Sequence, residues 1–542
     1  MSSVPKAPRP IRSLARHGLA LSLLTLGSRF LGLFREMTKA SLLGTSALSD
    51  AFSVAFMIPN LFRRLFAEGS IAVAFIPTLK EYLLADSQGL SDNRKKILEF
   101  LSCIFTVLIF FVTLTVIAGI LAAPAVVSLF NIEAFDETVF LTRLMFPFLG
   151  FISIAALFQG ILNSVQVFAP SGLAPILLNL VIILCAYGLS PFTQNPARAM
   201  AAGVLIGGFL EAAIQLPFVL KKGFPFFFTG LKRAIRHPGT RKTLRLIGPT
   251  IVGMAAYQLN DLVSTALAGS AGEGIVSSLQ YSLRIQELIL GVFAVSIGTV
   301  LLPDLAEHAK SSHWETYNNR LVSAMNIIAF ITIPITFFSL SQGEILIRFL
   351  FQSRSFDETS VALTLSAFTF HMPGIFFIAL NRVLAPAFYA QSDSRSPTLA
   401  GILSFAVNIA LAALLAGPLK GAGIALALSL SSAVNTALLL LFLRRNPRIS
   451  LDKNLRSILA HAAKLILFSC LAALPVAALS PRLLPGLALH RRAGYGLLLT
   501  VNALVFAAVG LTLLAATRDK QFREIIRMLG KKKPTSDAGP TN

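Results

Sequence analysis

The chain has 542 residues, of which 55% are hydrophobic and 13% charged, and its mean hydropathy is +0.74. This composition excludes a string of soluble domains, because too little polar surface is available to cover them. Successive apolar stretches of about 20 residues, each able to cross a hydrocarbon core of roughly 30 Å, predict an all-α polytopic membrane protein.

Fourteen transmembrane helices are predicted between charged or Pro/Gly-rich breaks. In chain order they span residues 17–44, 50–79, 97–129, 139–167, 171–190, 197–220, 243–268, 275–303, 321–341, 360–388, 397–416, 421–443, 457–479 and 493–516. The first resembles a signal peptide, but Arg29 interrupts its apolar run and no cleavage site follows. We therefore expect this helix to be retained.

The basic residues predict the orientation of the chain. Of 47 Lys and Arg residues, 31 lie in the termini and connections of one side and 7 in the opposite connections. Because cytoplasmic loops retain basic residues, both termini are predicted to be cytoplasmic. The net charge of +22 then indicates contact with membrane lipids and not with nucleic acid.

A weak internal repeat predicts the domain organisation. Sliding the chain by 226 residues places Gly27 on Gly253, Pro77 on Pro303, and Pro147 on Pro373. Six helices separate the copies, so they share one orientation and predict two six-helix lobes around a central cationic cavity, followed by two further helices. The predicted parts are an N-terminal segment 1–16, an N-lobe 17–220, an amphipathic linker 221–242, a C-lobe 243–443, helices 13 and 14 within 444–516, and a basic tail 517–542.

The linker mixes basic residues with Phe224, Phe226, Phe227 and Phe228. Such a pattern suits a segment that lies at the surface of an anionic leaflet.

Nine basic residues fall within the predicted spans. One of them, Arg64, directly follows Arg63. Near helix ends, where a long side chain can reach the headgroups, lie Arg143, Arg382, Lys464 and Lys39. Deeper in their segments lie Arg29, Arg35, Arg63 and Arg284. At roughly 3 kcal/mol each, these four arginines require compensation.

Two explanations of the deep arginines stay open. Acidic neighbours would neutralise them in the pairs Arg64 with Glu68, Arg284 with Glu287 and Arg29 with Glu36, or across helices through Asp50, Asp261 or Glu211. Alternatively, they line a water-filled cationic cavity, where guanidinium groups bind a phosphate or carboxylate.

Nothing in the sequence indicates an enzyme. Converging carboxylates, histidines or cysteines are not evident, and the three cysteines lie apart in apolar stretches without a CxxC pair. No P-loop is present, so transport would draw on an ion gradient or the membrane potential.

Several motifs resemble the MurJ (MviN-type) family. They are SRFLG at 28–32 with Arg35 and Glu36, DAF at 50–52, IPNLFRRLFAEG at 58–69, YSLR at 281–284 and LFQSRSF at 350–356. The resemblance covers residues 12 to 515, and the block at 58–69 is its most specific part.

The resemblance implies a flippase of the multidrug/oligosaccharidyl-lipid/polysaccharide exporter superfamily, which carries lipid II across the bacterial inner membrane. Its implied substrate-binding residues are Arg29, Arg35, Arg63 and Arg284, its transport or gating residues are Asp50, Arg64, Glu68 and Glu287, and its two C-terminal helices form a groove for the lipid tail. Leu283 departs from the family, in which an acidic residue often precedes the arginine, and the proline common a few residues later is also missing.

The resemblance also bears on cofactors and partners. No cofactor is expected except coupled sodium, for which Asp261, Asn408 and Ser429 occupy the corresponding segments. Lipid II, membrane lipids and the cell-wall synthesis machinery are the implied partners.

Three rival functions remain. A cation-coupled drug exporter, or a flippase for another polysaccharide-linked lipid, would share the two-lobe plan, although a basic lining disfavours cationic drugs. A membrane-embedded transferase acting on polyprenyl phosphates would need clustered acids or histidines on one membrane face. A protein that binds partners without transport would also fit the sequence.

Overall fold

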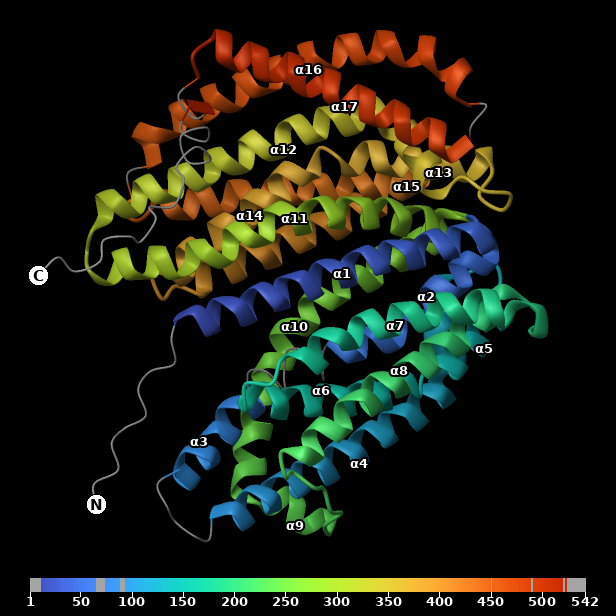
Figure 1. The fold of residues 1–542 in the computed structure, drawn as a ribbon, viewed down its shortest axis with the longest axis vertical. Helices are drawn as coiled ribbons and strands as arrows, with labels where there is room; N and C mark the ends of the chain where they lie inside the picture. The colour runs from blue at the N-terminus through green and yellow to red at the C-terminus, as the bar shows by residue number, and fades with distance from the viewer. Residues whose placement is uncertain are drawn as a thin grey trace, which may run out of the picture. The chain divides into compact units, whose positions relative to one another are not determined.

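The computed structural model describes residues 11–64, 74–87, 93–449, 451–488, 491–519 and 522–523, and every regular element in these ranges is helical. The elements, drawn in Figure 1, are α1 (Ile11–Leu43), α2 (Ala47–Arg63), α3 (Ile76–Ser87), α4 (Asn93–Val127), η3 (Ser128–Phe130), α5 (Phe135–Met145), α6 (Phe148–Ser164), α7 (Ala169–Gly188), η4 (Ser190–Phe192), α8 (Pro196–Lys221), α9 (Leu231–Arg236), α10 (Pro238–Ser270), α11 (Ile275–Lys310), α12 (Trp314–Phe351), α13 (Glu358–His371), α14 (Gly374–Tyr389), α15 (Arg395–Arg444), α16 (Leu451–Ala488) and α17 (Arg491–Ala516).

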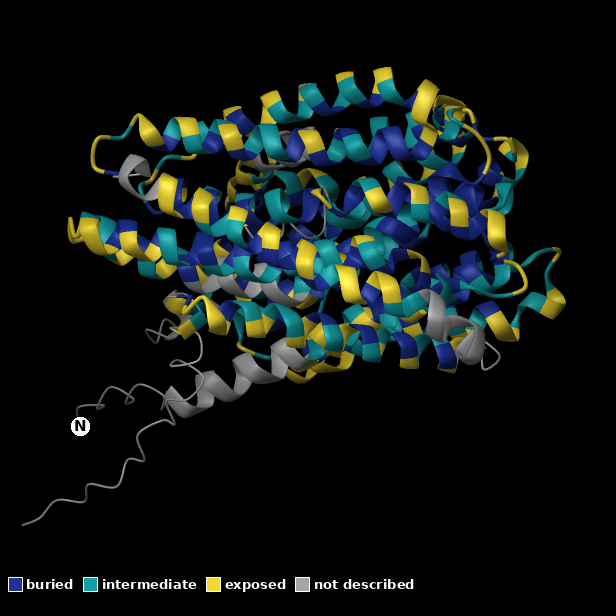
Figure 2. Cartoon of the chain, turned by 90° about the horizontal axis from the view of Figure 1, so that it is seen from above, coloured by how far each residue is buried: buried dark blue, intermediate teal, exposed yellow. Residues whose placement is uncertain are grey.

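Within the described residues, eight helices are long and apolar enough to cross a membrane, or nine if α13 and α14, bent by 45°, form one span. Large apolar side chains on α4 face outward, with Phe111 47%, Leu114 54% and Leu121 74% exposed. Figure 2 marks such exposed positions along many helices. An outward apolar surface of this kind suits contact with lipid. The all-helical membrane fold is as predicted, and the number fourteen stays a prediction.

Local sequence explains several helix boundaries. Asn195 caps α8 by accepting a hydrogen bond from Arg198 N at 3.0 Å, and Pro196 occupies the first helical position. In α15, Lys420 has φ 48° and ψ −130°, which divides the 50-residue element where the sequence predicts two helices.

The second predicted span differs in part from the structure. Helix α2 ends at Arg63 and α3 begins at Ile76, while residues 65–73 lie outside the described part. Helix α3 also continues to Ser87, into a stretch predicted as a connection. In this extension Tyr82 and Leu83 pack against the apolar cluster that contains Phe100 of α4, and the ring centroids of Tyr82 and Phe100 lie 4.9 Å apart.

The helices group into two compact units. Unit 1 comprises Met1–Leu288, Phe351–Ala367 and Asn408–Ala427, and unit 2 comprises Ile289–Leu350, Phe368–Val407 and Leu428–Asn542. Helices α11, α13 and α15 contribute to both. The predicted boundaries of the N-lobe and C-lobe stay a prediction.

Each unit has its own apolar packing. In unit 1, Phe52 of α2 packs with Leu141 of α5, Phe148 of α6 and Met200 of α8 in one cluster. In unit 2, Leu465 and its neighbours on α16 pack against α12, and α16 lies beside α17 (Figure 1). The charged residues considered next all belong to unit 1.

Candidate functional site

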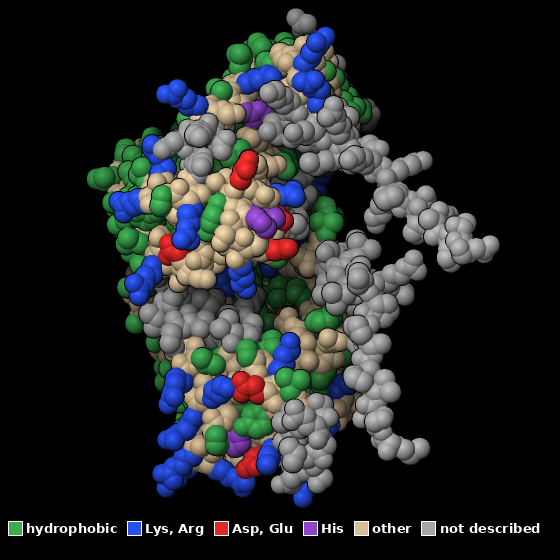
Figure 3. Space-filling view, turned by 90° about the vertical axis from the view of Figure 1, so that its left-hand side faces the viewer, with side chains coloured by type: hydrophobic (Ala, Val, Ile, Leu, Met, Phe, Trp, Pro, Cys, Tyr) green, Lys and Arg blue, Asp and Glu red, His purple; other side chains and the backbone are tan. Residues whose placement is uncertain are grey.

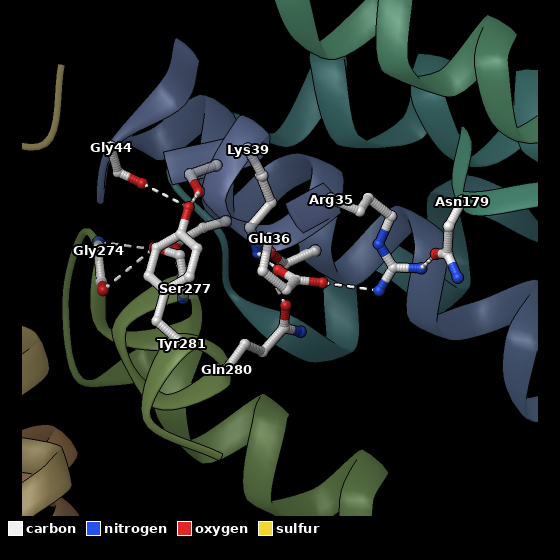
Figure 4. A network of polar contacts seen from close by, with 12 residues as sticks. Arg35, Glu36, Lys39, Gly44, Asn179, Gly274, Ser277, Gln280 and Tyr281 are labelled. Atoms are coloured by element: carbon white, nitrogen blue, oxygen red, sulfur yellow. Dashed lines mark hydrogen bonds and ion pairs between the residues drawn. The ribbon is translucent and has the colours of Figure 1, made fainter. Parts of the chain in front are cut away.

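Arg35 of α1 is held through both arms of its guanidinium. Nη2 donates to Glu36 Oε1 at 2.7 Å, and Nη1 donates to Asn179 Oδ1 of α7 at 3.1 Å (Figure 4). The guanidinium also lies 5.5 Å from the centroid of the Phe56 ring. These contacts fix the position of a cation within the bundle and leave 17% of its side chain exposed.

Lys39 lies one turn further along α1 and is only 2% exposed. Its Nζ is 3.3 Å from Glu36 Oε2 and donates to Ser53 Oγ at 3.0 Å and Gln280 Oε1 at 3.1 Å. It also lies 4.5 Å from the centroid of the Tyr281 ring. The expectation that Lys39 reaches the headgroups is therefore wrong, because α2 and α11 surround its ammonium group with polar and aromatic partners.

Arg284 of α11 rests directly on α1. Its Nη1 lies 3.2 Å from Glu287 Oε2, as the spacing of three residues predicts. A Cβ atom added to Gly32 would lie 1.7 Å from Arg284 Nη2, so the glycine provides the space for the guanidinium. Glu287 thus supplies a local carboxylate for Arg284, and its role as substitute for the acidic residue of the family pattern stays a prediction.

Arg63 and Arg64 stand at the C-terminal end of α2. Arg63 Nε donates to Asn60 Oδ1 at 2.7 Å. Arg64 Nη1 lies 3.3 Å from Asp261 Oδ2 of α10 and 3.5 Å from Gln258 Oε1. The side chains of Arg64 and Asp261 are 36% and 44% exposed, so this ion pair is accessible to a competing ion.

Two other residues were predicted to form ion pairs, namely Arg29 and Glu68. Arg29 is partly buried and forms no hydrogen bond or ion pair with another described residue. Its suggested partner Glu36 binds Arg35 and Lys39 instead. Glu68, the suggested partner of the arginine at 64, lies outside the described residues.

Asp50 caps the N-terminus of α11. Its carboxylate accepts hydrogen bonds from Gly274 N at 2.7 Å and Ser277 N at 2.8 Å, and the residue is 2% exposed. A carboxylate is favoured at this helix end by the free amides and by the helix dipole. One turn later, the Tyr281 hydroxyl donates to the Gly44 carbonyl at 2.9 Å, so α11 is joined to the turn between α1 and α2.

The residues expected to bind sodium have other partners. Asp261 pairs with an arginine of α2, Asn408 Nδ2 donates to Asn260 Oδ1 at 2.7 Å, and Ser429 Oγ donates to the Phe370 carbonyl at 2.6 Å. Among the residues that the structure describes, no group of three or more His, Cys, Asp or Glu could hold a metal ion. Sodium binding by these three residues stays a prediction.

Together, the cations of α1, α2 and α11 are a set of groups suited to an anionic ligand. Arg35, Arg64 and Arg284 each contact a carboxylate at 2.7–3.3 Å. A phosphate can replace a carboxylate at a guanidinium fork without leaving the buried charge unpaired. The chemistry open to this arrangement is binding and exchange of anions.

Comparison with known proteins shows the family to which the chain belongs. A family model described as lipid II flippase MurJ matches residues 39–491, which is most of the chain. The chain belongs to the MurJ lipid II flippase family. A relative from Treponema pallidum, named probable lipid II flippase MurJ, is 46% identical over 520 residues, covering 95% of this chain and 98% of the relative. The lipid II flippase MurJ of Burkholderia cenocepacia is 33% identical over 445 residues, covering 80% and 84%.

Solved structures show the same fold. A lipid II flippase MurJ in an inward closed conformation has a TM-score of 0.75 at 23% identity, covering 94% of this chain and 100% of that one. An inward-facing multidrug resistance MATE transporter of the MOP superfamily has a TM-score of 0.62 at 14% identity, covering 80% and 95%. The MurJ-family chain is therefore built on a transporter fold, as its motifs predict.

Several polar residues of this site were missed in the sequence. Asn179, Gln258 and Gln280 contact the basic side chains but are uncharged, and nothing in their own segments marks them. Lys39 could have been recognised by its spacing of four residues from Arg35 on the same helical face.

Proposed function

We propose that this MurJ-family chain carries lipid II, the undecaprenyl-pyrophosphate-linked peptidoglycan precursor, from the cytoplasmic to the outer leaflet of the bacterial inner membrane. The curated relatives are named for this substrate. The observation that carries the proposal is the pair of cations Arg35 on α1 and Arg284 on α11, whose carboxylate partners a pyrophosphate could replace.

The proposed mechanism is alternating access. Arg29, Arg35, Arg63 and Arg284 bind the pyrophosphate, and Glu36 returns to its cationic neighbours once the lipid has left. The membrane potential contributes about 2.3 kcal/mol per elementary charge per 100 mV, so an inside-negative potential favours outward passage of the anionic headgroup. It likewise favours inward return of the emptied, positively charged site.

The remaining parts of the proposal follow from the same assignment. The chain transports lipid II without catalysing a reaction, and both of its termini face the cytoplasm. The lipid tail follows α16 and α17. The cell-wall synthesis machinery receives the transported lipid II. Asp261 acts as the counter-charge of Arg64. Sodium coupling through Asp261, Asn408 and Ser429 would require this carboxylate to leave its arginine.

The test is lipid II translocation in cells depleted of their own flippase and supplied with this gene. The outer-leaflet accessibility of the precursor is measured with and without collapse of the membrane potential. Rescue that is lost when the potential collapses supports both the substrate and the driving force. Absence of rescue by an inserted, well-expressed chain would refute the lipid II assignment and direct the search to another polysaccharide-linked anionic lipid.

Arg63→Ala is the decisive variant. We expect it to insert normally and to lose translocation, because the pyrophosphate loses a guanidinium that nothing replaces. Arg143→Ala is a matched control, since that arginine donates to the Ile120 carbonyl at 3.2 Å and is not assigned to substrate. Wild-type translocation by Arg63→Ala would refute the role assigned to this arginine.

A further inference from the structure

The segment between α8 and α10 presents exposed cations next to exposed aromatic rings. We call this set the linker surface, and it consists of Lys221, Lys222, Phe227, Phe228, Lys232 and Arg236. Phe227 is 61% and Phe228 is 72% exposed. In the lower part of Figure 3, at the end of unit 1 that contains α3, α4 and α9, Lys and Arg side chains surround patches of hydrophobic side chains.

The backbone of this segment is fixed on α4. Phe227 N donates to Ser102 Oγ at 3.2 Å, and Thr229 N donates to Thr106 Oγ1 at 3.1 Å. Two side-chain hydroxyl groups of one helix thus satisfy the amides of an extended segment. The exposed phenylalanines are held in place by these bonds.

Neighbouring rings complete the support. Phe226 packs on Phe105 and Phe158, with ring centroids 5.0 and 5.4 Å apart, and is partly buried. The ring centroid of Phe228 lies 5.4 Å from that of Phe105, and most of the Phe228 side chain remains exposed. Exposing this apolar area to water is unfavourable, so the arrangement indicates an apolar environment outside the protein.

The cations of the linker surface differ from their neighbours. Arg233 pairs with Glu99 at 2.6 Å, and Lys242 pairs with Glu81 at 2.6 Å. In contrast, Lys232 and Arg236 of α9 form no ion pair with a described residue, and neither do the two lysines at the end of α8. These four exposed charges are therefore available to an anionic partner.

The depth of the segment in the bilayer follows from α4. This helix has 35 residues and is about 52 Å long at ~1.5 Å per residue, which exceeds a hydrocarbon core of roughly 30 Å. If the last ~20 residues before Val127 cross that core, Ser102 and Thr106 lie at its boundary with the headgroups. The rings of Phe227 and Phe228 then lie at the same level.

We propose that the linker surface binds anionic phospholipid headgroups of the leaflet at which α8 ends. Phe227 and Phe228 insert at the acyl boundary, and the four cations bind lipid phosphates. Only the choice of the cytoplasmic leaflet rests on the proposed function, because it uses the proposed orientation. Binding itself does not depend on which lipid the protein transports.

The insertion is tested with the full chain in vesicles, using the single tryptophan, Trp314. In a Trp314→Phe/Phe228→Trp variant, lipids brominated near the headgroup should quench the tryptophan strongly, and aqueous acrylamide should quench it weakly. The unaltered chain provides the reference spectrum. Strong acrylamide quenching without bromine quenching would overturn the proposal, since the ring would then lie in water.

The preference for anionic lipid is tested by two double variants with the same loss of charge. With brominated phosphatidylglycerol against brominated phosphatidylcholine as probes, Lys232→Gln/Arg236→Gln in the tryptophan variant should reduce the preference several-fold, at most about five-fold per cation. Arg233→Gln/Lys242→Gln, which removes ion-paired cations, should change it less than about two-fold. Equal effects would show a general influence of net charge and would overturn specific binding. Neither readout requires lipid II transport, so failure here is distinguishable from failure of the proposed function.

Discussion

Replacing Gly32 with alanine should displace Arg284 without disturbing the helices. The added Cβ would lie 1.7 Å from Arg284 Nη2, 3.0 Å from Cζ and 3.7 Å from Nε, and no backbone atom is among these neighbours. Because non-bonded heavy atoms approach to ~3.5 Å, the end of the guanidinium must retreat by about 1.8 Å. The Arg284 side chain is long, so it can move while α1 and α11 keep their positions.

The expected loss of substrate affinity follows from the hydrogen bond that the displaced Arg284 would no longer make. A charge-assisted hydrogen bond contributes about 1.5–3 kcal/mol, which corresponds to a reduction of about 10- to 100-fold in the affinity for an anionic substrate. Alanine is the better helix former by about 1 kcal/mol, so thermal stability should be unchanged or higher. Gly32→Ala should therefore transport slowly and remain well folded.

The assay is the initial rate of lipid II translocation by purified variants in vesicles, together with a thermal melt. Gly27→Ala is the control on the same helix, because its Cβ would meet Ile176 Cδ1 at an ordinary 3.7 Å. In the Arg284→Ala background, Gly32→Ala should add little to the loss of rate. A wild-type rate for Gly32→Ala, or additive losses in the double variant, would refute the idea that the glycine acts by admitting Arg284.

Three further predictions concern other carboxylates. Asp50→Ala should destabilise the chain by about 1–2 kcal/mol through the loss of a helix cap and so lower the melting temperature, whereas Asp50→Asn, which keeps one of the two acceptor oxygens, should lose less; a melting curve that does not distinguish the two would contradict the capping role. Asp261→Asn should release Arg64 and tighten binding of an anionic lipid headgroup measured by titration, and unchanged affinity would show that the ion pair does not restrain this arginine. Burial is the largest single influence on Asp519 and opposes its ionisation, but the 2.8 Å hydrogen bond from Lys464, the hydrogen bond from Phe522 N and the charges of Lys464 and His461 together hold the pKa of Asp519 below its usual range. The lowered pKa means that this contact stabilises the end of α17 fully above the ordinary aspartate pKa and is lost as pH falls through the lowered value. The protection of residues 513–519 against hydrogen exchange, taken relative to the intrinsic rate at each pH, should therefore fall in acid, and should fall less in a Lys464→Met variant.

Much of the fold was predictable because every membrane-spanning helix needs an apolar stretch of about 20 residues to cross the hydrocarbon core. Most predicted segments from 97–129 onward coincide with helices of the structure within a few residues, and the division of α15 at Lys420 follows from Gly417, Pro418 and Gly421 nearby. The boundaries of α3 were less predictable. Packing of its apolar face on α4 extends it beyond the end of the hydrophobic run.

The sequence by itself determined the membrane class, the family motifs and the contacts made within one helix. The ion pair of Arg284 with Glu287 is of this kind, since a spacing of three residues brings side chains together on any α-helix. Only the tertiary structure decided which charges meet between helices. Asp50 caps a helix that begins more than 220 residues later, and Arg64 pairs with Asp261, 197 residues away. Such pairs depend on the rotation and depth of each helix, which are set by packing against neighbours and have no counterpart in the local pattern of residues.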